Sequence, residues 1–405
     1  MDSKRKHLSL VSFNHALTHG VVLSIPIAAK FIQDELEIDY VSIGIPLTMS
    51  VMIYGLAGPI AGYLVDREGA IKPMFLGITV TTFSMLALIL SENLYWFSIW
   101  IVIAGFGLSF AHPSGLTLVS QLFVKKRGKA MGTFGFVGQF GQFIPPVVAG
   151  AIGTYYSWKY IFLVFFILYL FALFYCSLLF KSKSESEDVE KPIPMEYKKA
   201  IRVLFTSIVI LVLLLTMLRG NYYRAITTLL PFYSKDIMEL EILTGAILLS
   251  IMLFSGLPGH LIGGWLADKY GPIKPLVIFT LTTIFGVILC LSLNIFVFTI
   301  GLCIVGFSFF SAQPSENVLT ANVSPLNVRG TLYGLKFVVS FGLSFVALII
   351  IFVLADIISL IIAFPIILIV AIIAMLNVII IAKVYKGPID FEESKAPEEE
   401  KWDFE

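Results

Sequence analysis

Few charged side chains fall inside the apolar stretches of this sequence, and those few are the candidates for chemistry. Arg219 lies in the stretch that starts at Leu213, close to Tyr222 and Tyr223. A guanidinium group matches the planar shape of a carboxylate or phosphonate, and nearby phenol groups can add hydrogen bonds. These three residues predict a site for a small organic anion. The structural alternative is an arginine that pairs with Glu316 or with backbone carbonyl groups.

Glu316 is the carboxylate found deep in an apolar stretch. A carboxyl group removed from water can take up a proton near neutral pH, which makes Glu316 a candidate for carrying a coupling proton. Gln313 in the same stretch is a candidate substrate ligand. Two further cations are ambiguous, because a long side chain near a helix end can reach the membrane surface. We expect this of Arg224, whereas Lys336 is either such a residue or a charge in a cavity.

Histidines are the remaining titratable candidates. His15 and His19 lie one helical turn apart in the first apolar stretch, and histidine titrates where a proton-driven carrier needs it. We take both as candidate proton carriers, and His19 and His112 as candidate substrate ligands; histidines that only pack are the alternative. A pair at this spacing could bind a metal, but the sequence shows no third ligand. We therefore expect no metal site and no cofactor.

The composition places these residues in a membrane protein. Hydrophobic residues make up 58% of the 405 residues and charged residues 14%, against about a quarter charged in a soluble domain. The formal net charge of +1 gives no reason to expect nucleic acid as a partner. Apolar runs of about 20 residues predict membrane-spanning helices. The chain holds twelve, at about 9–33, 42–65, 74–91, 95–123, 130–153, 158–180, 203–233, 242–266, 275–292, 295–322, 330–354 and 357–382.

The twelve runs divide into two sets of six. The sequence GYLVDREGAIKP at residue 62 returns as GWLADKYGPIKP at residue 264, and GFGLSFAHPSGLTLV from Gly105 is echoed from Gly306. Parallel repeats of this kind place a transporter's substrate site between the halves. We expect an all-α fold with two pseudo-symmetric six-helix halves, 1–180 and 203–386, a cytoplasmic linker 181–202 and an acidic, disordered tail 387–405.

The distribution of lysine and arginine predicts the orientation. Of the 28, 22 fall in segments on the side of the N-terminus and three on the opposite side. Short cytoplasmic segments are enriched in these residues. We expect both termini to be cytoplasmic, in a multi-pass protein of the cell membrane that is surrounded by lipid and works as a monomer.

The repeated loop resembles the signature of the major facilitator superfamily, and the resemblance covers almost the whole chain. The family pattern is Gly-x-Leu-Ala-Asp-(Arg/Lys)-x-Gly-Arg-(Arg/Lys), from which Ala70 and Pro272 depart where the family usually has Arg. The resemblance implies a transporter whose two loops latch the cytoplasmic face shut; a plain solvated turn is the alternative. The residues concerned are Gly62, Asp66, Arg67, Gly69, Gly264, Asp268, Lys269 and Gly271.

Two shorter resemblances favour export. Gly138, Gly141, Pro145 and Pro146 in the fifth run resemble the family's antiporter-associated motif, although close helix packing also explains the glycines. FAHPSG at 110–115, with the polar stretch around Arg219, looks like the fosmidomycin-resistance branch of drug exporters, which handles an anionic phosphonate.

The sequence therefore predicts a secondary transporter of a small organic solute, with an organic anion favoured, that works by alternating access and proton-coupled efflux. An uptake carrier for organic acids or phosphorylated metabolites is a rival within this class. A receptor that binds without transport is a rival outside it. The sequence shows no nucleotide loop, no catalytic triad and no appended domain, so we do not expect an enzyme.

Overall fold

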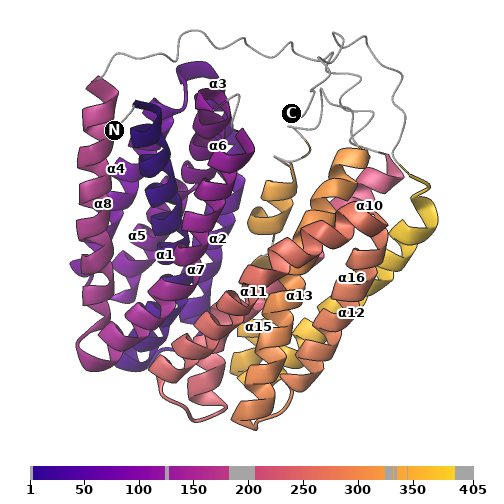
Figure 1. Ribbon diagram of the computed structural model, residues 1–405. Helices are drawn as coiled ribbons and strands as arrows, with labels where there is room; N and C mark the ends of the chain where they lie inside the picture. The colour runs from indigo at the N-terminus through magenta and orange to yellow at the C-terminus, as the bar shows by residue number, and fades with distance from the viewer. Residues whose placement is uncertain are drawn as a thin grey trace.

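The computed structural model describes residues 3–123, 127–181, 206–323, 332, 335–343 and 345–387, and these residues are almost entirely helical (Figure 1). The linker 181–202 and the tail 387–405 expected from the sequence lie almost wholly outside these ranges. The first half contains α1 (Ser3–Leu36), α2 (Tyr40–Leu56), α3 (Gly58–Glu68), α4 (Ile71–Ile89), α5 (Leu94–Leu108), α6 (Ala111–Leu122), α7 (Arg127–Tyr155) and α8 (Trp158–Lys181).

The second half contains α10 (Ser207–Asp236), α11 (Ile242–Tyr270), α12 (Ile273–Leu289), α13 (Ile295–Asn322), the short π-helix η2 (Val338–Gly342), α15 (Phe345–Ile357), the short 3₁₀-helix η3 (Leu360–Ile362) and α16 (Ala363–Val384). In the described chain, eleven helical stretches are long and apolar enough to cross a membrane, and α12 is a shorter apolar helix. Lipid offers the backbone no hydrogen-bond partners, so these sequences must satisfy their own amides as helices. The expected all-α membrane fold is confirmed.

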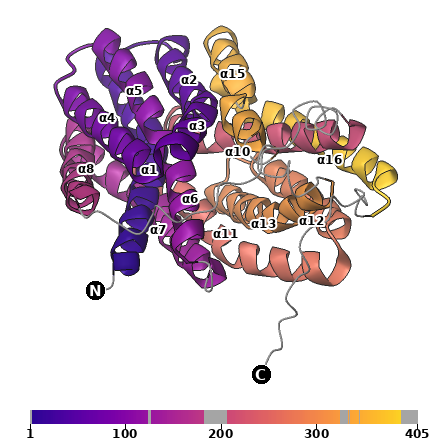
Figure 2. The ribbon, with the colours of Figure 1, turned by 90° about the horizontal axis from the view of Figure 1, so that it is seen from above.

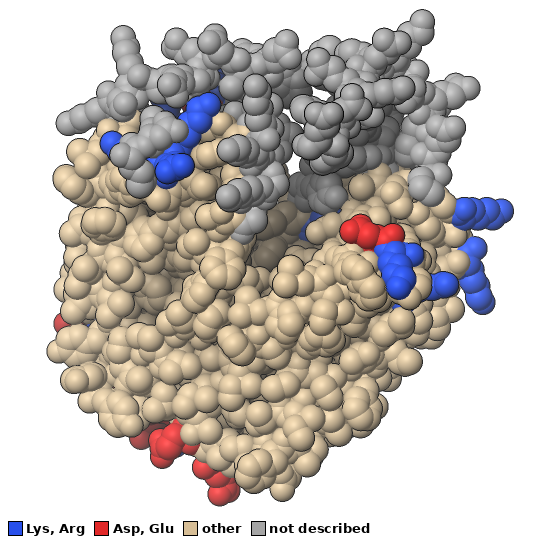
Figure 3. All heavy atoms as spheres, in the orientation of Figure 1, with Lys and Arg blue, Asp and Glu red and all other residues tan. Residues whose placement is uncertain are grey.

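The helices form two bundles that lie side by side (Figures 1 and 2). Within the bundles α1 packs on α7, α4 on α8, and α11 on both α13 and α12; across them α2 meets α15, α7 meets α11, and α1 meets α10. The bundles are close together at the end away from the chain termini and diverge towards the end that carries them (Figure 1). Figure 3 shows a recess between them at that end.

The two halves repeat the same backbone conformation at equivalent positions. Glu37 and Glu239 follow the first helix of each half and have φ angles of 51° and 56°. Gly69 and Gly271 end α3 and α11 with φ and ψ of 80° and 166° and of 74° and 172°. The region that the two glycines occupy is accessible essentially only to glycine. The repeated motif therefore needs a glycine at this point for its backbone conformation.

A hydrogen bond between helices is also repeated. Ser50 of α2 donates its hydroxyl group to the carbonyl oxygen of Ile101 at 2.8 Å, and Ser255 of α11 donates to that of Cys303 at 2.9 Å. Each bond joins the second spanning helix of a half to the fourth. The pseudo-symmetry predicted from the sequence thus extends from the loops into the membrane-spanning part.

Candidate functional site

Glu316 of α13 is the centre of a buried ionic cluster in the second half. Its Oε2 pairs with Nη1 of Arg219 on α10, and its Oε1 lies 2.9 Å from Nζ of Lys336. The Thr216 hydroxyl group donates to Oε1 at 2.6 Å. The exposed fractions of the Arg219, Glu316 and Lys336 side chains are 3%, 6% and 9%. Two cations therefore share one carboxylate away from water.

Arg219 has further contacts that fix its guanidinium group. Nη2 donates to the carbonyl oxygen of Phe309 at 2.6 Å, and the group lies 4.9 Å from the centre of the Phe309 ring. Its Nε is buried and has no hydrogen-bond partner among the described residues. A buried donor without a partner is costly. Arg219 is thus both the structural ion-pair partner that the sequence allowed and a guanidinium with spare donor capacity.

The cluster faces a cavity of about 490 Å³ between the two halves. This volume is within the range of pockets that hold small organic ligands. Leu116 of the first half and residues of α10, α13 and the segment around η2 all contribute to the wall. The lining residues are Leu116, Thr216, Arg219, Gly220, Phe309, Gln313, Glu316, Asn317, Lys336, Phe337, Ser340 and Phe341.

The predicted aromatic partners of Arg219 pack around Phe309. The Tyr223 ring stacks on Phe309, with centroids 4.2 Å apart, and the buried Tyr222 ring meets Phe309 edge-on at 5.9 Å. Neither tyrosine is among the described residues that line the cavity. The Tyr222 side chain also interacts directly with Arg219. Tyr223 instead supports Phe309, which in turn contacts Arg219. Gln313, in contrast, is exposed and lines the cavity, and its role as a substrate ligand stays a prediction.

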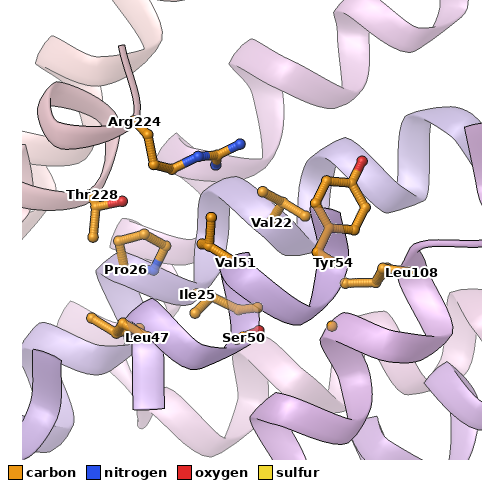
Figure 4. Close-up of a pocket in the computed structure, with 11 residues that line it drawn as sticks. Val22, Ile25, Pro26, Leu47, Ser50, Val51, Tyr54, Leu108, Arg224 and Thr228 are labelled. Carbon is orange, nitrogen blue, oxygen red and sulfur yellow. The ribbon is translucent and has the colours of Figure 1, made fainter. Parts of the chain in front are cut away.

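Arg224 does not reach a membrane surface, so that expectation was wrong. Only 4% of it is exposed, and its guanidinium group lies 5.3 Å from the centre of the Phe341 ring. It points towards α1 and α2 beside Tyr54, at a small pocket lined from both halves (Figure 4). The reason is that α10 packs against α1, which buries this face of α10 between the halves. Among the described residues, no acidic side chain forms an ion pair with Arg224.

Three histidines meet in the first half. His15 and His19 of α1 lie with their Nε2 atoms 2.9 Å apart, and His112 of α6 lies with its ring centre 4.8 Å and 5.2 Å from theirs. One ligand atom from each histidine falls within 4.8 Å of the other two. The fold thus brings a third histidine to the pair, which the sequence does not reveal because His112 is far from the pair along the chain.

The antiporter-like motif shapes the contact between α7 and α1. A Cβ atom on Gly141 would meet the backbone of Ala16, and one on Gly138 would meet the His15 ring. Pro145 and Pro146 lie inside α7. The glycines therefore permit the close packing that places His15, whatever else the motif does.

The two repeated loop motifs lie at the end of the molecule that carries the chain termini, where the bundles diverge. Arg67 is exposed and lies 3.6 Å from its neighbour Glu68, and Asp268 and Lys269 are exposed at the end of α11. The side chain of Asp66 is outside the described part. A Cβ atom added to Gly62 would meet no atom within 4 Å, and one added to Gly264 would meet only Cβ of Pro314, at 4.0 Å. Among the described side chains no ion pair joins the two copies.

Sequence reasoning missed a group of contacts that closes the opposite end. Lys30 of α1 lies 2.7 Å from Asp34 and 2.7 Å from Asp236 of α10. The Tyr40 hydroxyl group donates to Asp236 at 2.9 Å. Asp356 of α15 accepts from the backbone amides of Tyr40 and Val41 at 2.8 Å each. A signal was present, because Asp34 and Asp236 have the same spacing as the two copies of the loop and so occupy equivalent places in the repeats.

The N-terminus of α2 has a second acidic cap beside this group. Asp39 accepts from the backbone amide of Ser42 at 2.6 Å. Hydrogen bonding from the Ser42 side chain, together with this backbone bond, holds the pKa of Asp39 below its usual value. Two carboxylates at one helix N-terminus suit its positive end.

Comparison with known proteins agrees with this geometry. The profile of the Major Facilitator Superfamily matches residues 8–348. The multi-drug resistance efflux pump PmrA of Streptococcus pneumoniae is 25% identical over 297 residues, which cover 70% of this chain and 71% of PmrA. The quinolone resistance protein NorB of Staphylococcus aureus is 25% identical over 189 residues, or 44% of this chain and 41% of NorB.

Solved structures share the fold at low sequence identity. A bacterial homolog to the human lysosomal transporter Spinster, in an inward-facing and unoccupied conformation, superimposes with a TM-score of 0.77 at 12% identity and covers 96% of this chain and 100% of its own. The nucleoside transporter NupG gives 0.75 at 13% identity, with coverage of 95% and 100%. The solved structures show the same fold. The family profile and the curated relatives confirm the resemblance carried by the repeated loop, and they indicate a transporter rather than an enzyme.

Proposed function

The chain belongs to the Major Facilitator Superfamily, and we propose that it exports a small organic anion by alternating access, in exchange for protons. The charge at its centre carries the proposal. Arg219, Lys336 and Arg224 are buried, while Glu316 is the one buried carboxylate among the described residues and pairs with Arg219 and Lys336 only. An uncompensated cation in a membrane interior is costly and marks a functional site. An anion that enters the cavity would relieve this imbalance.

The two arginines suit different parts of such a solute. Arg219 lines the central cavity with an Nε donor that no described residue accepts, and Arg224 lies beside the smaller pocket that α1, α2, α5 and α10 enclose. Phe341 links the two places, since it lines the cavity and also lies under Arg224. We infer that an anionic group binds to a guanidinium while the apolar body of the solute packs on Phe337 and Phe341. Gln313, which lines the cavity, stays a proposed ligand, as do His19 and His112 of the first half.

Glu316 is the proposed proton carrier. Its carboxylate holds Arg219 and Lys336, so protonation would weaken both contacts at once. Binding and release of one proton would therefore change which donors are available to the solute. His15 and His19 stay predictions for this role, because their mutual contact supports a different chemistry that is argued below.

The direction of transport has two candidates. Relatives described as a multi-drug resistance efflux pump and a quinolone resistance protein support export. The ion pairs of Glu316 with Arg219 and Lys336 favour inward cotransport of the anion with a proton, because protonated Glu316 would release both cations to bind an anion. In that case the proton and the anion would bind together rather than in turn.

The two ends of the molecule support an alternating-access cycle. The contacts of Lys30, Tyr40 and Asp356 hold one end shut, and the recess opens at the end with the termini (Figure 3). We propose that the open end faces the cytoplasm of a cell whose plasma membrane the protein spans as a monomer. In the opposite conformation the loop motifs at Asp66, Arg67, Asp268 and Lys269 would close that end.

A thermal-shift screen of the detergent-purified protein is the first test. A ligand that binds the folded state raises the melting temperature. We expect stabilisation by phosphonates, carboxylates or sugar phosphates and none by neutral sugars. Stabilisation by lipophilic cations alone would contradict the proposed anion site.

Flux through proteoliposomes then decides the mechanism. With a stabilising anion inside and a lumenal pH indicator, exchange predicts proton entry as the anion leaves, whereas cotransport predicts movement of both in the same direction. Binding without flux would indicate a receptor. Glu316→Gln should abolish pH-driven accumulation and keep anion exchange, and full pH-driven accumulation by this variant would exclude Glu316 as the proton carrier.

A further inference from the structure

The proposed transport does not explain why three histidines meet within one half. We propose that His15, His19 and His112 form a binding site for a divalent transition-metal ion, for which Zn²⁺ is the probe. Each contributes one ring nitrogen, and the three nitrogens lie within 4.8 Å of one another. Imidazole nitrogen is a preferred ligand of zinc, nickel and copper.

The spacing needs only small side-chain rotations to fit a metal ion. A zinc–nitrogen bond is about 2.0–2.1 Å, which separates two tetrahedral ligands by about 3.4 Å. The Nε2 atoms of His15 and His19 are 2.9 Å apart, slightly closer than this. His112 must approach them by at most about 1.4 Å to complete the set.

Hydrogen bonds outside the cluster orient two of the rings. Nδ1 of His15 lies 3.2 Å from the carbonyl oxygen of Phe134. A carbonyl group can only accept, so Nδ1 of His15 must carry the hydrogen, and its Nε2 presents a lone pair to the cluster. Nδ1 of His112 lies 3.1 Å from the Tyr54 hydroxyl group, which leaves its Nε2 available. Metal-binding histidines almost always have such a partner on the second nitrogen.

The site is held by packing as well as by hydrogen bonds. The His15 ring stacks on Phe134 with centroids 4.1 Å apart and an angle of 6° between the planes. The close approach of α7 to this ring is possible because Gly138 has no side chain. His112 in turn contacts Phe337 of the second half, at 5.4 Å between ring centres. The ligands come from α1 and α6, which are part of one bundle, so the site stays assembled when the halves move.

The charges nearby determine what else such an ion would bind. The three ligands are neutral when they coordinate, and Arg224 is close enough to His19 that its positive charge would oppose a bound cation. Three protein ligands leave a fourth position open, as in catalytic rather than structural zinc sites. An anion in that position would offset both the ion and Arg224.

Equilibrium binding tests the site without any transport. The full chain is purified in detergent, stripped with a chelator and titrated with ZnCl₂ by calorimetry, and Co²⁺ is added separately because its visible absorption reports tetrahedral nitrogen coordination. We expect one ion per chain and the tetrahedral cobalt spectrum. His15→Ala, His19→Ala and His112→Ala should each weaken binding at least tenfold. Tyr54→Phe, which removes an outer hydrogen bond, should weaken it about tenfold.

His260→Ala is the matched control, because His260 bonds to Gln139 outside the cluster and should leave zinc affinity unchanged. Thermal unfolding of each variant in chelator separates loss of a ligand from loss of the fold. Absence of zinc binding to the unmodified protein would overturn the proposal, as would unchanged affinity in the double variant His15→Ala/His19→Ala. Neither result depends on anion transport, so the proposed function is judged separately.

Discussion

Lys30 of the first half and Asp236 of the second form an ion pair across the closed end of the molecule, with 2.7 Å between Nζ and Oδ1. The same ammonium group holds Asp34, at 2.7 Å. Asp34 and Asp236 are equivalent residues of the two repeats, so one lysine binds both copies of the same carboxylate. This contact is buried at the lysine, of which 3% is exposed.

Lys30→Met should weaken the closed end, because Asp236 would lose its cation and keep the hydrogen bond from the Tyr40 hydroxyl group. We expect a loss of about 1–3 kcal/mol in the stability of this conformation, less than for a fully buried pair because Asp236 is partly exposed. Spin labels at Glu92→Cys and Leu293→Cys, in the loops at that end, should report longer distances. Lys235→Met, one residue from Asp236 and outside this ion pair, is the control. Unchanged distances in Lys30→Met would show that the pair does not hold the end shut.

Arg219→Ala should abolish binding of an anionic substrate while the protein stays folded. Glu316 keeps Lys336 at 2.9 Å and Thr216 at 2.6 Å, so the carboxylate is not left without a partner. We expect the anion to lose about 2–5 kcal/mol of binding free energy, as for truncation of a buried charge contact. Arg219→Lys keeps the charge and loses the fork of donors, so it should bind the anion with intermediate affinity. Normal transport by Arg219→Ala would remove Arg219 from the substrate site.

Arg224→Ala should behave differently, because no acidic side chain of the described chain is left unpaired by it. Burial of an unpaired charge is unfavourable, so the melting temperature should stay the same or rise. Anion affinity should still fall by about 2–5 kcal/mol. Thr228→Val, on the wall of the same small pocket, is the control for local packing. A marked loss of stability in Arg224→Ala would show that this arginine has a structural role.

Gly271→Ala tests the backbone of the repeated loop. A Cβ atom there meets no atom within 4 Å, so only the φ of 74° opposes the change. We expect a cost of about 1–3 kcal/mol in unfolding free energy. Gly62→Ala also places its Cβ in open space, but within a helix, and should be neutral or slightly stabilising. Equal effects of the two substitutions would contradict a conformational origin.

The sequence predicted the fold well because lipid leaves the backbone few options. Twelve apolar runs and one internal repeat were enough to predict two bundles of helices, with limits that agree closely for most spans. Glu316 and Arg219 were recognised because a charge in an apolar run is conspicuous. Their ion pair was foreseen as an alternative, since each needs a partner once it is out of water.

The direction in which a helix faces was harder to predict. Arg224 was expected at a surface because hydropathy says where along a helix a residue lies and not which neighbour its side chain meets. His112 could not be joined to His15 and His19, because that contact depends on how α6 packs against α1. The contacts of Lys30 and Asp356 could not be predicted, since charged residues at helix ends are common in sequences. Long-range packing decides each of these cases.

The two repeats share a backbone and differ in chemistry. His112 and Gln313 occupy matching positions in the echoed motif, yet the first belongs to a group of histidines and the second to the wall of an ionic cavity. A carrier built from two identical first halves would have two such histidine groups at its centre and no buried acid–base cluster. If one ancestral gene segment was duplicated to make this chain, the histidine group of the first half and the ionic cluster of the second became different after that duplication.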